Sequence, residues 1–208
     1  MKKILLSLLA LVVIITLQAQ INLSNAKIGD QTWMVKNLDV DHYRNGTPIP
    51  QVTDPTTWAY LTTGAWCYYN NDSIQGKTYG KLYNWYAVND PGGLAPKGWH
   101  IPSDAEWTTL ENSLGGSTVA GGKIKEVGTL HWTTPNNGAN NNSSLTGVPG
   151  GQRGVNAFFM TIGENCLWWS SSESNTLGVL RILSFTDGRI SKTLGNKNFG
   201  YSVRCVKD

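Results

Sequence analysis

The chain has 208 residues, with 17 lysines and arginines against 14 aspartates and glutamates, so its formal net charge is only +3. A charge this small gives no electrostatic argument for binding nucleic acid or an acidic membrane surface. The length fits one domain with a sizeable core, or at most two small ones. The nine tryptophans and 23 glycines stand out; tryptophan at this density supplies both buried area and binding surfaces.

The first residues predict a secretory signal peptide over residues 1–19. Met1-Lys2-Lys3 precede an apolar run, Ile4 to Leu17, and then Gln18-Ala19-Gln20, which is the order of the basic, apolar and cleavage regions in such signals. The apolar run is too short to cross a hydrocarbon core of about 30 Å. We therefore expect an exported mature domain over residues 20–208, in the periplasm or at the cell exterior, without a membrane span.

The first part of the mature chain predicts a hairpin and an ordered loop. Ile28–Val35 alternates apolar and polar residues around a Gly-Asp turn, which indicates an opening hairpin or edge strand. Residues 45–63 are rich in Pro, Thr and Gly, and we expect a surface loop held down by Trp58 and Tyr60. The run over residues 79–88 mixes both periodicities, so a strand and a short helix both stay open.

The strongest local signal is a helix start at residues 103–106. Ser103 is followed three residues later by Glu106, which is a capping box in which each side chain satisfies the other residue's free backbone N–H. Trp107, Leu110 and Leu114 then fall on one face, and two glycines supply a stop. We expect a helix of about three turns packed on a sheet.

A second short helix is expected at residues 119–125, followed by irregular chain. Residues 128–144 consist mostly of Asn, Thr, Gly and Pro, which predicts a long loop. Irregular backbone is expected to continue through Pro149-Gly150-Gly151.

The C-terminal part predicts β-structure. Two β-runs, 179–186 and 189–192, flank Asp187-Gly188, a dipeptide that favours a type I′ hairpin turn. A last strand over residues 200–206 places Tyr201, Val203 and Cys205 on one buried face and Ser202 and Arg204 on the other.

Several stretches, taken in order along the chain, resemble one family. They are Ile28-Gly29-Asp30-Gln31-Thr32-Trp33-Met34, Tyr79-Gly80-Lys81-Leu82-Tyr83-Asn84-Trp85, Gly98-Trp99-His100-Ile101-Pro102-Ser103-Asp104-Ala105-Glu106-Trp107, Pro149-Gly150-Gly151, Trp168-Trp169-Ser170-Ser171-Ser172-Glu173 and Gly200-Tyr201-Ser202-Val203-Arg204-Cys205. The family is the Fibrobacter succinogenes major paralogous domain of exported Bacteroidetes-type proteins. The resemblance implies a single α+β domain related distantly to the C-type lectin-like fold, with small twisted antiparallel sheets, one or two helices and long loops. It brings no established reaction.

Three cysteines lie in this chain, which is expected to be exported. In an oxidising compartment two of them would normally pair, and spacing leaves all three pairings open. Cys67 and Cys205 lie in stretches that look like the family pattern, whereas Cys166 does not. The resemblance therefore implies a Cys67–Cys205 disulfide, whose loop closure would stabilise the domain by roughly 4 to 5 kcal/mol in chain-entropy models.

No metal site or cofactor is expected. His42, His100 and His131 are far apart in the sequence and belong to no His/Cys ligand cluster. The stretches Asn70-Asn71-Asp72 and Asn140-Asn141-Asn142 offer hard oxygens, so calcium stays open beside the simpler interpretation that these residues form turns.

Enzymatic activity is not expected either. The candidate carboxylates for glycoside hydrolysis are scattered along the chain: Glu106, Glu111, Glu126, Glu164 and Glu173. The serine run at residues 170–172 lacks a nucleophile elbow. A cysteine-dependent reaction would rest on Cys166, with no resolving partner.

The composition instead favours binding. Aromatic rings stack on sugar faces and amides pair with hydroxyls. We expect five tryptophans in the core, Trp85, Trp99, Trp107, Trp168 and Trp169, and a ligand site on a long loop formed by Trp132, Asn136, Asn137, Asn140, Asn141, Gln152 and Arg153. The sequence thus predicts a non-catalytic exported module that binds a glycan or a surface protein. The alternative is a structural envelope protein that acts by self-association or partner association. A glycosidase or a cysteine-dependent enzyme is the least favoured hypothesis.

Overall fold

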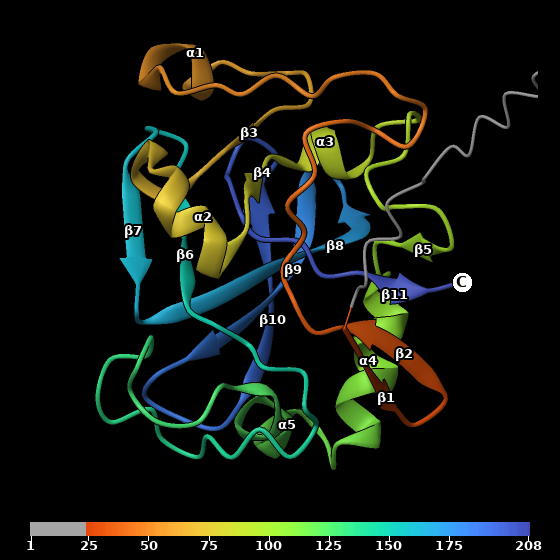
Figure 1. Cartoon of the computed structure of the whole chain (residues 1–208), viewed down its shortest axis with the longest axis vertical. Helices are drawn as coiled ribbons and strands as arrows, with labels where there is room; N and C mark the ends of the chain where they lie inside the picture. Colours follow the sequence, from red (N-terminus) through yellow and green to blue (C-terminus); the bar gives the residue numbers. More distant parts are fainter. Residues whose placement is uncertain (1–23) are drawn as a thin grey trace, which may run out of the picture.

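A computed structural model describes residues 24–208 (Figure 1). The predicted signal peptide, residues 1–19, lies outside this range. The elements in chain order are β1 (Asn25–Ile28), β2 (Gln31–Met34), α1 (Pro55–Ala59), β3 (Trp66–Cys67), the 3-10 turn η1 (Tyr69–Asn71), α2 (Ser73–Tyr79), β4 (Leu82–Tyr83), α3 (Trp85–Val88), β5 (Trp99–His100), α4 (Asp104–Ser113), α5 (Ser117–Ile124), β6 (Gly150–Arg153), β7 (Phe159–Ile162), β8 (Asn165–Ser174), β9 (Leu177–Ser184), β10 (Ile190–Asn196) and β11 (Val206–Lys207).

The two ends of the described chain meet in one sheet. β1 and β2 form the expected hairpin, whose turn places Gly29 at a φ of 58°, a conformation that costs glycine little. The sheet order is β1-β2-β11-β5, and Val206 pairs with Trp33 on one side and His100 on the other. The C-terminal strand therefore joins the opening hairpin to the segment that precedes α4 (Figure 1).

A three-stranded antiparallel sheet, in the order β10-β9-β8, divides most of the core into two layers. Because neighbouring strand residues point to opposite faces, adjacent Trp168 and Trp169 lie in different hydrophobic clusters. Trp169 packs with Leu180 and Tyr201, and Trp168 packs in the cluster that lies under α4 and α5. All five tryptophans that the sequence assigned to the core are buried.

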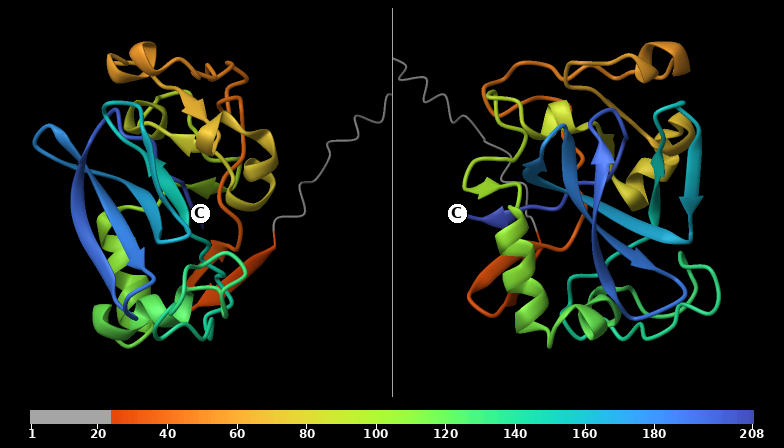
Figure 2. Two further views of the ribbon diagram at one scale, coloured as in Figure 1. Left: turned by 90° about the vertical axis from the view of Figure 1, so that its left-hand side faces the viewer. Right: turned by 180° about the vertical axis from the view of Figure 1, so that it is seen from behind.

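Helix α4 begins as the capping box predicts. Ser103 Oγ accepts from the Glu106 backbone N–H at 3.3 Å, and Glu106 Oε2 accepts from the Ser103 N–H at 2.8 Å. Trp107 and Leu110 are fully buried against the second cluster. Figure 2 shows α4 beside the long C-terminal strands, with α5 at their lower end.

The early loop is held down by one of its two aromatic residues. It contains the short helix α1, which Asp54 caps. Trp58 is buried and its Nε1 donates to the Asn198 carbonyl at 2.8 Å. Tyr60 is 82% exposed, so the expectation that it anchors the loop is wrong.

Two further expectations about the C-terminal half need correction. Residues 150–153 form strand β6, which pairs with β7, where irregular backbone was expected. The β9–β10 hairpin is present, but Leu183 pairs with Ile190, so the loop is wider than a two-residue turn. Neither Asp187 nor Gly188 has the positive φ of a type I′ turn.

The last segment is buried on both faces. Tyr201, Val203 and Cys205 lie inside as predicted, yet Arg204 is fully buried as well. Its guanidinium donates to the Met34 carbonyl at 3.0 Å and the Leu145 carbonyl at 2.8 Å. The expected strand over residues 200–206 is too long: only Val206–Lys207 form a strand, β11, and the chain before it makes isolated bridges inside the domain.

The expected Cys67–Cys205 disulfide is wrong. Cys67, Cys166 and Cys205 are all free, buried thiols. Each belongs to a different hydrophobic cluster, and these clusters keep the three side chains apart. Burial raises the pKa of Cys67 and of Cys205 to about 12.

Candidate functional site

The residues that the sequence predicts for ligand binding do not form one site in the structure. Trp132 is 2% exposed, its Nε1 donates to the Gly147 carbonyl at 3.0 Å, and the Lys125 ammonium lies 5.3 Å from its ring centre. Its ring therefore presents no face to a ligand. Within residues 128–144, which form the expected long loop, Trp132 serves as the hydrophobic anchor.

The asparagines of this loop mostly bond to its own backbone. Asn136 is buried and donates to the Glu126 and Gly128 carbonyls at 2.9 and 2.7 Å. Asn137 is exposed, but its amide donates to the Thr186 carbonyl at 3.0 Å. Asn140 and Asn141 accept from backbone N–H groups within the loop. The Asn137 contact fixes the loop against the β9–β10 turn, and the others fix the shape of the loop itself.

Arg153 lies in another part of the molecule. It is 1% exposed, donates to the Val52 and Thr53 carbonyls at 2.6 and 2.9 Å, and lies over the Trp58 ring at 4.5 Å. Gln152 is half-buried on β6. The nominated residues thus do not converge on one surface, and Trp132, Asn136 and Arg153 serve the fold.

Within residues 24–208, no group of three or more His, Cys, Asp or Glu side chains is placed to hold a metal ion. The stretches considered for calcium lie in turns and at a helix start. Asp72 Oδ1 accepts from the Ile74 N–H at 2.8 Å, and Asn70, Asn71 and Asn141 all have positive φ. In the same described range, no helix is long and apolar enough to cross a membrane.

A surface hollow of about 590 Å³ lies where the N-terminus of α4 meets the three-stranded sheet. Three of the residues along it are serine or threonine, two carry carboxylates, one is a lysine and two are apolar. These residues are Asp104, Ser172, Glu173, Ser174, Val179, Lys192, Thr193 and Leu194.

The hollow exists because α4 covers only part of the sheet. Three cross-strand pairs of β9 and β10 follow one another on this face: Leu183–Ile190, Arg181–Lys192 and Val179–Leu194. The first pair is buried under the helices and the second lies at the first turns of α4. The third lies beyond the helix start and forms an apolar floor, on which Leu194 is 43% exposed.

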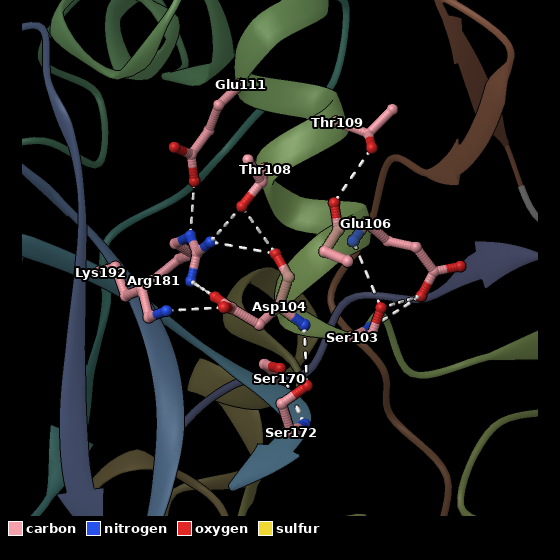
Figure 3. Close-up of polar contacts among 11 residues, drawn as sticks. Ser103, Asp104, Glu106, Thr108, Thr109, Glu111, Ser170, Ser172, Arg181 and Lys192 are labelled. Atoms are coloured by element: carbon pink, nitrogen blue, oxygen red, sulfur yellow. Dashed lines mark hydrogen bonds and ion pairs between the residues drawn. The ribbon is translucent and has the colours of Figure 1, made fainter. Parts of the chain in front are cut away.

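Arg181 fixes the helix to the sheet at the edge of the hollow (Figure 3). Its side chain is 1% exposed, and its Nε donates to Glu111 Oε1 at 2.5 Å. Its Nη1 lies 2.8 Å from Asp104 Oδ1, an ion pair whose angles fall outside hydrogen-bond geometry. Its Nη2 donates to the Asp104 carbonyl and to Thr108 Oγ1, both at 3.3 Å. Sheet and helix therefore share one buried cation.

Asp104 is held on three sides. Lys192 Nζ donates to its Oδ2 at 2.6 Å, and its backbone N–H donates to Ser172 Oγ at 3.0 Å. Burial favours a higher pKa for the Asp104 carboxyl, but the hydrogen bonds and charges of Lys192 and Arg181 outweigh it, so this pKa is lowered. The Asp104 carboxylate is accordingly ionised at neutral pH.

Ser172 reaches Asp104 because β8 is irregular there. The β8–β9 register shifts between Trp169 and Glu173, and such a bulge redirects side chains. Ser170 Oγ accepts from the Ser172 N–H at 2.9 Å, which fixes the bend. The serine run at residues 170–172 therefore aims one hydroxyl, that of Ser172, at the helix start.

The charges around the hollow balance. Glu173 pairs with Lys197 at 2.5 Å, in addition to the contacts of Asp104 and Glu111 described above. Three carboxylates thus face three cations: Arg181, Lys192 and Lys197. The hollow offers a ligand hydrogen-bond donors and acceptors around an apolar floor, and each of its charged side chains is already paired.

Sequence reasoning missed Asp104, Ser172, Arg181 and Lys192. One signal was available, because Arg181 interrupts an otherwise apolar run, Val179 to Leu183. A cation inside a buried strand requires carboxylate or carbonyl partners. The sequence could not show that these partners come from α4.

The fold and the hollow define a class: an α+β domain of small antiparallel sheets around a tryptophan-rich core, with a polar ligand-sized depression at the start of its main helix. The chain belongs to the family of the Fibrobacter succinogenes major domain, whose model matches residues 26–207. This confirms the family predicted from the sequence motifs. No curated protein and no solved structure matches the chain.

Proposed function

We propose that this domain is an exported, non-catalytic binding module that holds an uncharged, hydroxyl-rich ligand, a glycan, in the hollow between α4 and strands β8–β10. The observation that carries the proposal is the combination of an apolar floor, Val179 and Leu194, with a rim of fixed hydrogen-bonding groups. Ligand sites commonly unite an apolar surface with a few precisely held polar groups.

The charge balance supports a neutral ligand. An anionic ligand would face Asp104 and Glu173, and a cationic one would have to displace Lys192 or Lys197 from their carboxylates. A sugar ring neither brings a charge next to these carboxylates nor displaces a lysine. Its hydroxyls both donate and accept hydrogen bonds, and its C–H face packs on apolar side chains.

The state of Asp104 favours binding over hydrolysis. Most glycosidases use two carboxyl groups, one of them protonated as a general acid. Asp104 is the carboxylate fixed at the helix start, and Arg181 and Lys192 lower its pKa. A carboxylate held ionised accepts hydrogen bonds from a ligand but does not donate a proton to a leaving group.

A cysteine-dependent reaction has equally little support. Cys166 is fully buried in the second cluster, and burial raises its pKa above the usual value. A nucleophilic thiol needs a lowered pKa and access to the substrate. The family's distant kinship with the C-type lectin-like fold remains part of this proposal, supported by long loops above small antiparallel sheets.

The test begins with a glycan array probed with the mature chain, followed by NMR titration with the best ligand. We expect amide shifts to cluster at residues 104, 172–174 and 192–194. Leu194→Glu places a charge on the floor and should weaken binding at least tenfold. Val119→Glu is the matched control, because Val119 is 45% exposed on α5 and lies outside the hollow.

Two results would overturn the proposal. One is an array on which the folded protein binds no glycan. The other is a bound glycan whose shifts map outside the hollow and whose affinity is the same for Leu194→Glu and Val119→Glu.

A further inference from the structure

Among residues 24–208, strand β10 has backbone partners on only one of its two sides. All seven of its residues pair with β9 on the inner side. On the outer side, no residue between Ser191 and Gly195 has a backbone hydrogen bond to any other part of residues 24–208. Four consecutive residues, Ser191 to Leu194, are exposed. An unpaired strand edge of this kind is a template for another strand.

The other sheet edges in the described chain are shorter or occupied. β8 donates hydrogen bonds along its outer side, from the Trp169 N–H to the Ser202 carbonyl and from the Ser171 N–H to the Pro102 carbonyl. β1 and β7 have four residues each, against seven in β10. β10 is therefore the longest strand whose edge remains open.

The sequence of β10 is complementary to itself when run antiparallel. Centred on Thr193, the strand places Lys192 opposite Leu194 of a second copy, Ser191 opposite Gly195 and Ile190 opposite Asn196. No like charges face each other, and Thr193 meets Thr193 in a cross-strand pair of a kind that stabilises sheets. We propose that two copies of this chain associate through their β10 edges, around a twofold axis at Thr193.

One feature of β10 would ordinarily oppose this pairing. Lysine on an edge strand is a common device against edge-to-edge association, because its charge is costly to cover. Here the Lys192 ammonium is bound to Asp104 of its own chain at 2.6 Å. Its aliphatic stem then remains to pack against Leu194 of the second copy, so its charge does not block the edge.

Pairing around this axis would create one six-stranded sheet. Both hollows would lie on the same face, because directly opposite residues of antiparallel strands project to the same side. A repeating polymer could then engage both hollows, which raises apparent affinity without any new contact. This last consequence rests on the proposed function, whereas the association itself does not.

The experiment measures the mass of the mature chain by analytical ultracentrifugation over a wide concentration range. We expect twice the monomer mass at high concentration. Thr193→Lys and Thr193→Glu each place like charges directly opposite each other, and each should raise the dimer dissociation constant at least tenfold. Mixed in equal amounts, the two variants should form a heterodimer, because lysine then faces glutamate. Ser191→Lys is the matched control, since it adds the same charge opposite Gly195 and should leave the dimer intact.

Three outcomes would overturn the proposal: a wild-type chain that stays monomeric at every concentration, a dimer that Thr193→Lys leaves unchanged, or two Thr193 variants that are separately monomeric and do not associate when mixed. Circular dichroism verifies that the variants fold. Should one not fold, slower amide exchange in residues 191–195 of the wild type at high concentration is the expected result, and unchanged exchange contradicts the interface. Glycan binding by a protein that remains monomeric would contradict the proposed dimer but not the proposed function.

Discussion

Arg181 and Asp104 form an ion pair of 2.8 Å between the middle of a buried strand and the first residue of the main helix. Arg181 is 1% exposed, and the same guanidinium binds Glu111 two turns further along α4. The orientation of the helix on the sheet, and with it the shape of the hollow, depends on this one cation.

Replacing Arg181 by methionine should destabilise the domain by about 3–5 kcal/mol, because its removal leaves the partly buried Glu111 without a cation and Asp104 with only the exposed Lys192. Urea unfolding followed by circular dichroism measures the change. The control is Lys192→Met: Lys192 is 54% exposed in its pair with Asp104, so its loss should cost only about 0–1 kcal/mol. Equal effects of the two substitutions would show that Arg181 does not hold helix and sheet together.

Lys125 ties the long loop to the β9–β10 turn. Its fully buried ammonium donates to the carbonyls of Asn137, Ser184 and Asp187 at 2.8, 2.9 and 2.8 Å. Lys125→Met leaves these three acceptors unsatisfied at about 1–3 kcal/mol each, so we expect a loss of about 3 kcal/mol or more and faster amide exchange in residues 137–147. Lys123→Met, in the last turn of α5 just before Lys125, should change neither quantity appreciably, and a loop equally protected in both variants would contradict this role.

Alkaline pH should destabilise the fold through its buried thiols. Burial raises the pKa of Cys67 and Cys205 to about 12 and that of Cys166 further, from an ordinary value of 9.0. Above pH 9 the unfolded chain loses protons that the native chain keeps, so stability falls with rising pH by up to about 1.4 kcal/mol per pH unit for each thiol.

The measurement is the free energy of unfolding between pH 8 and 11, under reducing conditions. Raised pKa values of Tyr83 and Tyr201 act in the same direction, whereas the pKa of Lys125, lowered to about 8 by burial, acts against it. Cys166→Ala isolates one thiol: the variant is less stable throughout, but its stability should fall less steeply with pH. Parallel curves for the variant and the wild type would refute the assignment.

His100 should make the stability depend on pH near neutrality as well, but less strongly. Here the cause is a protonated group that the fold stabilises. Burial favours a lower pKa, but hydrogen bonds from its ring to Glu106 at 2.6 Å and Asp208 at 2.8 Å outweigh it and raise the pKa above the usual value. The contribution of His100 to stability is therefore complete below pH 6.5 and is lost as pH rises through the raised pKa. Because the ring is 39% exposed, we expect less than about 1 kcal/mol.

The comparison of wild type with His100→Gln at pH 5.5 and pH 8.5 measures this term. The wild type should be favoured at the lower pH and the difference should shrink at the higher one. A difference that does not change with pH would mean that the protonated ring adds nothing to the fold.

The sequence alone predicted those features of the fold whose physical cause lies between residues close together in the chain. The Ser103–Glu106 capping box located the start of α4 because both hydrogen bonds join residues three apart. The alternation around Gly29 located the first hairpin, and the motifs along the chain identified the family. Burial of five tryptophans followed from their size and apolar character.

Only the tertiary structure decided which side chains meet. Trp132 was nominated as a binding surface because its loop looks exposed, but the loop folds back and Lys125 anchors it, so the ring is buried. The three thiols were candidates for a disulfide, but the fold places each of them in a different hydrophobic cluster. Arg181 and Asp104 lie 77 residues apart. Sequence periodicity shows which face of an element is apolar. It does not show which distant element packs on that face or how far this element extends, and the hollow lies where α4 no longer covers the sheet.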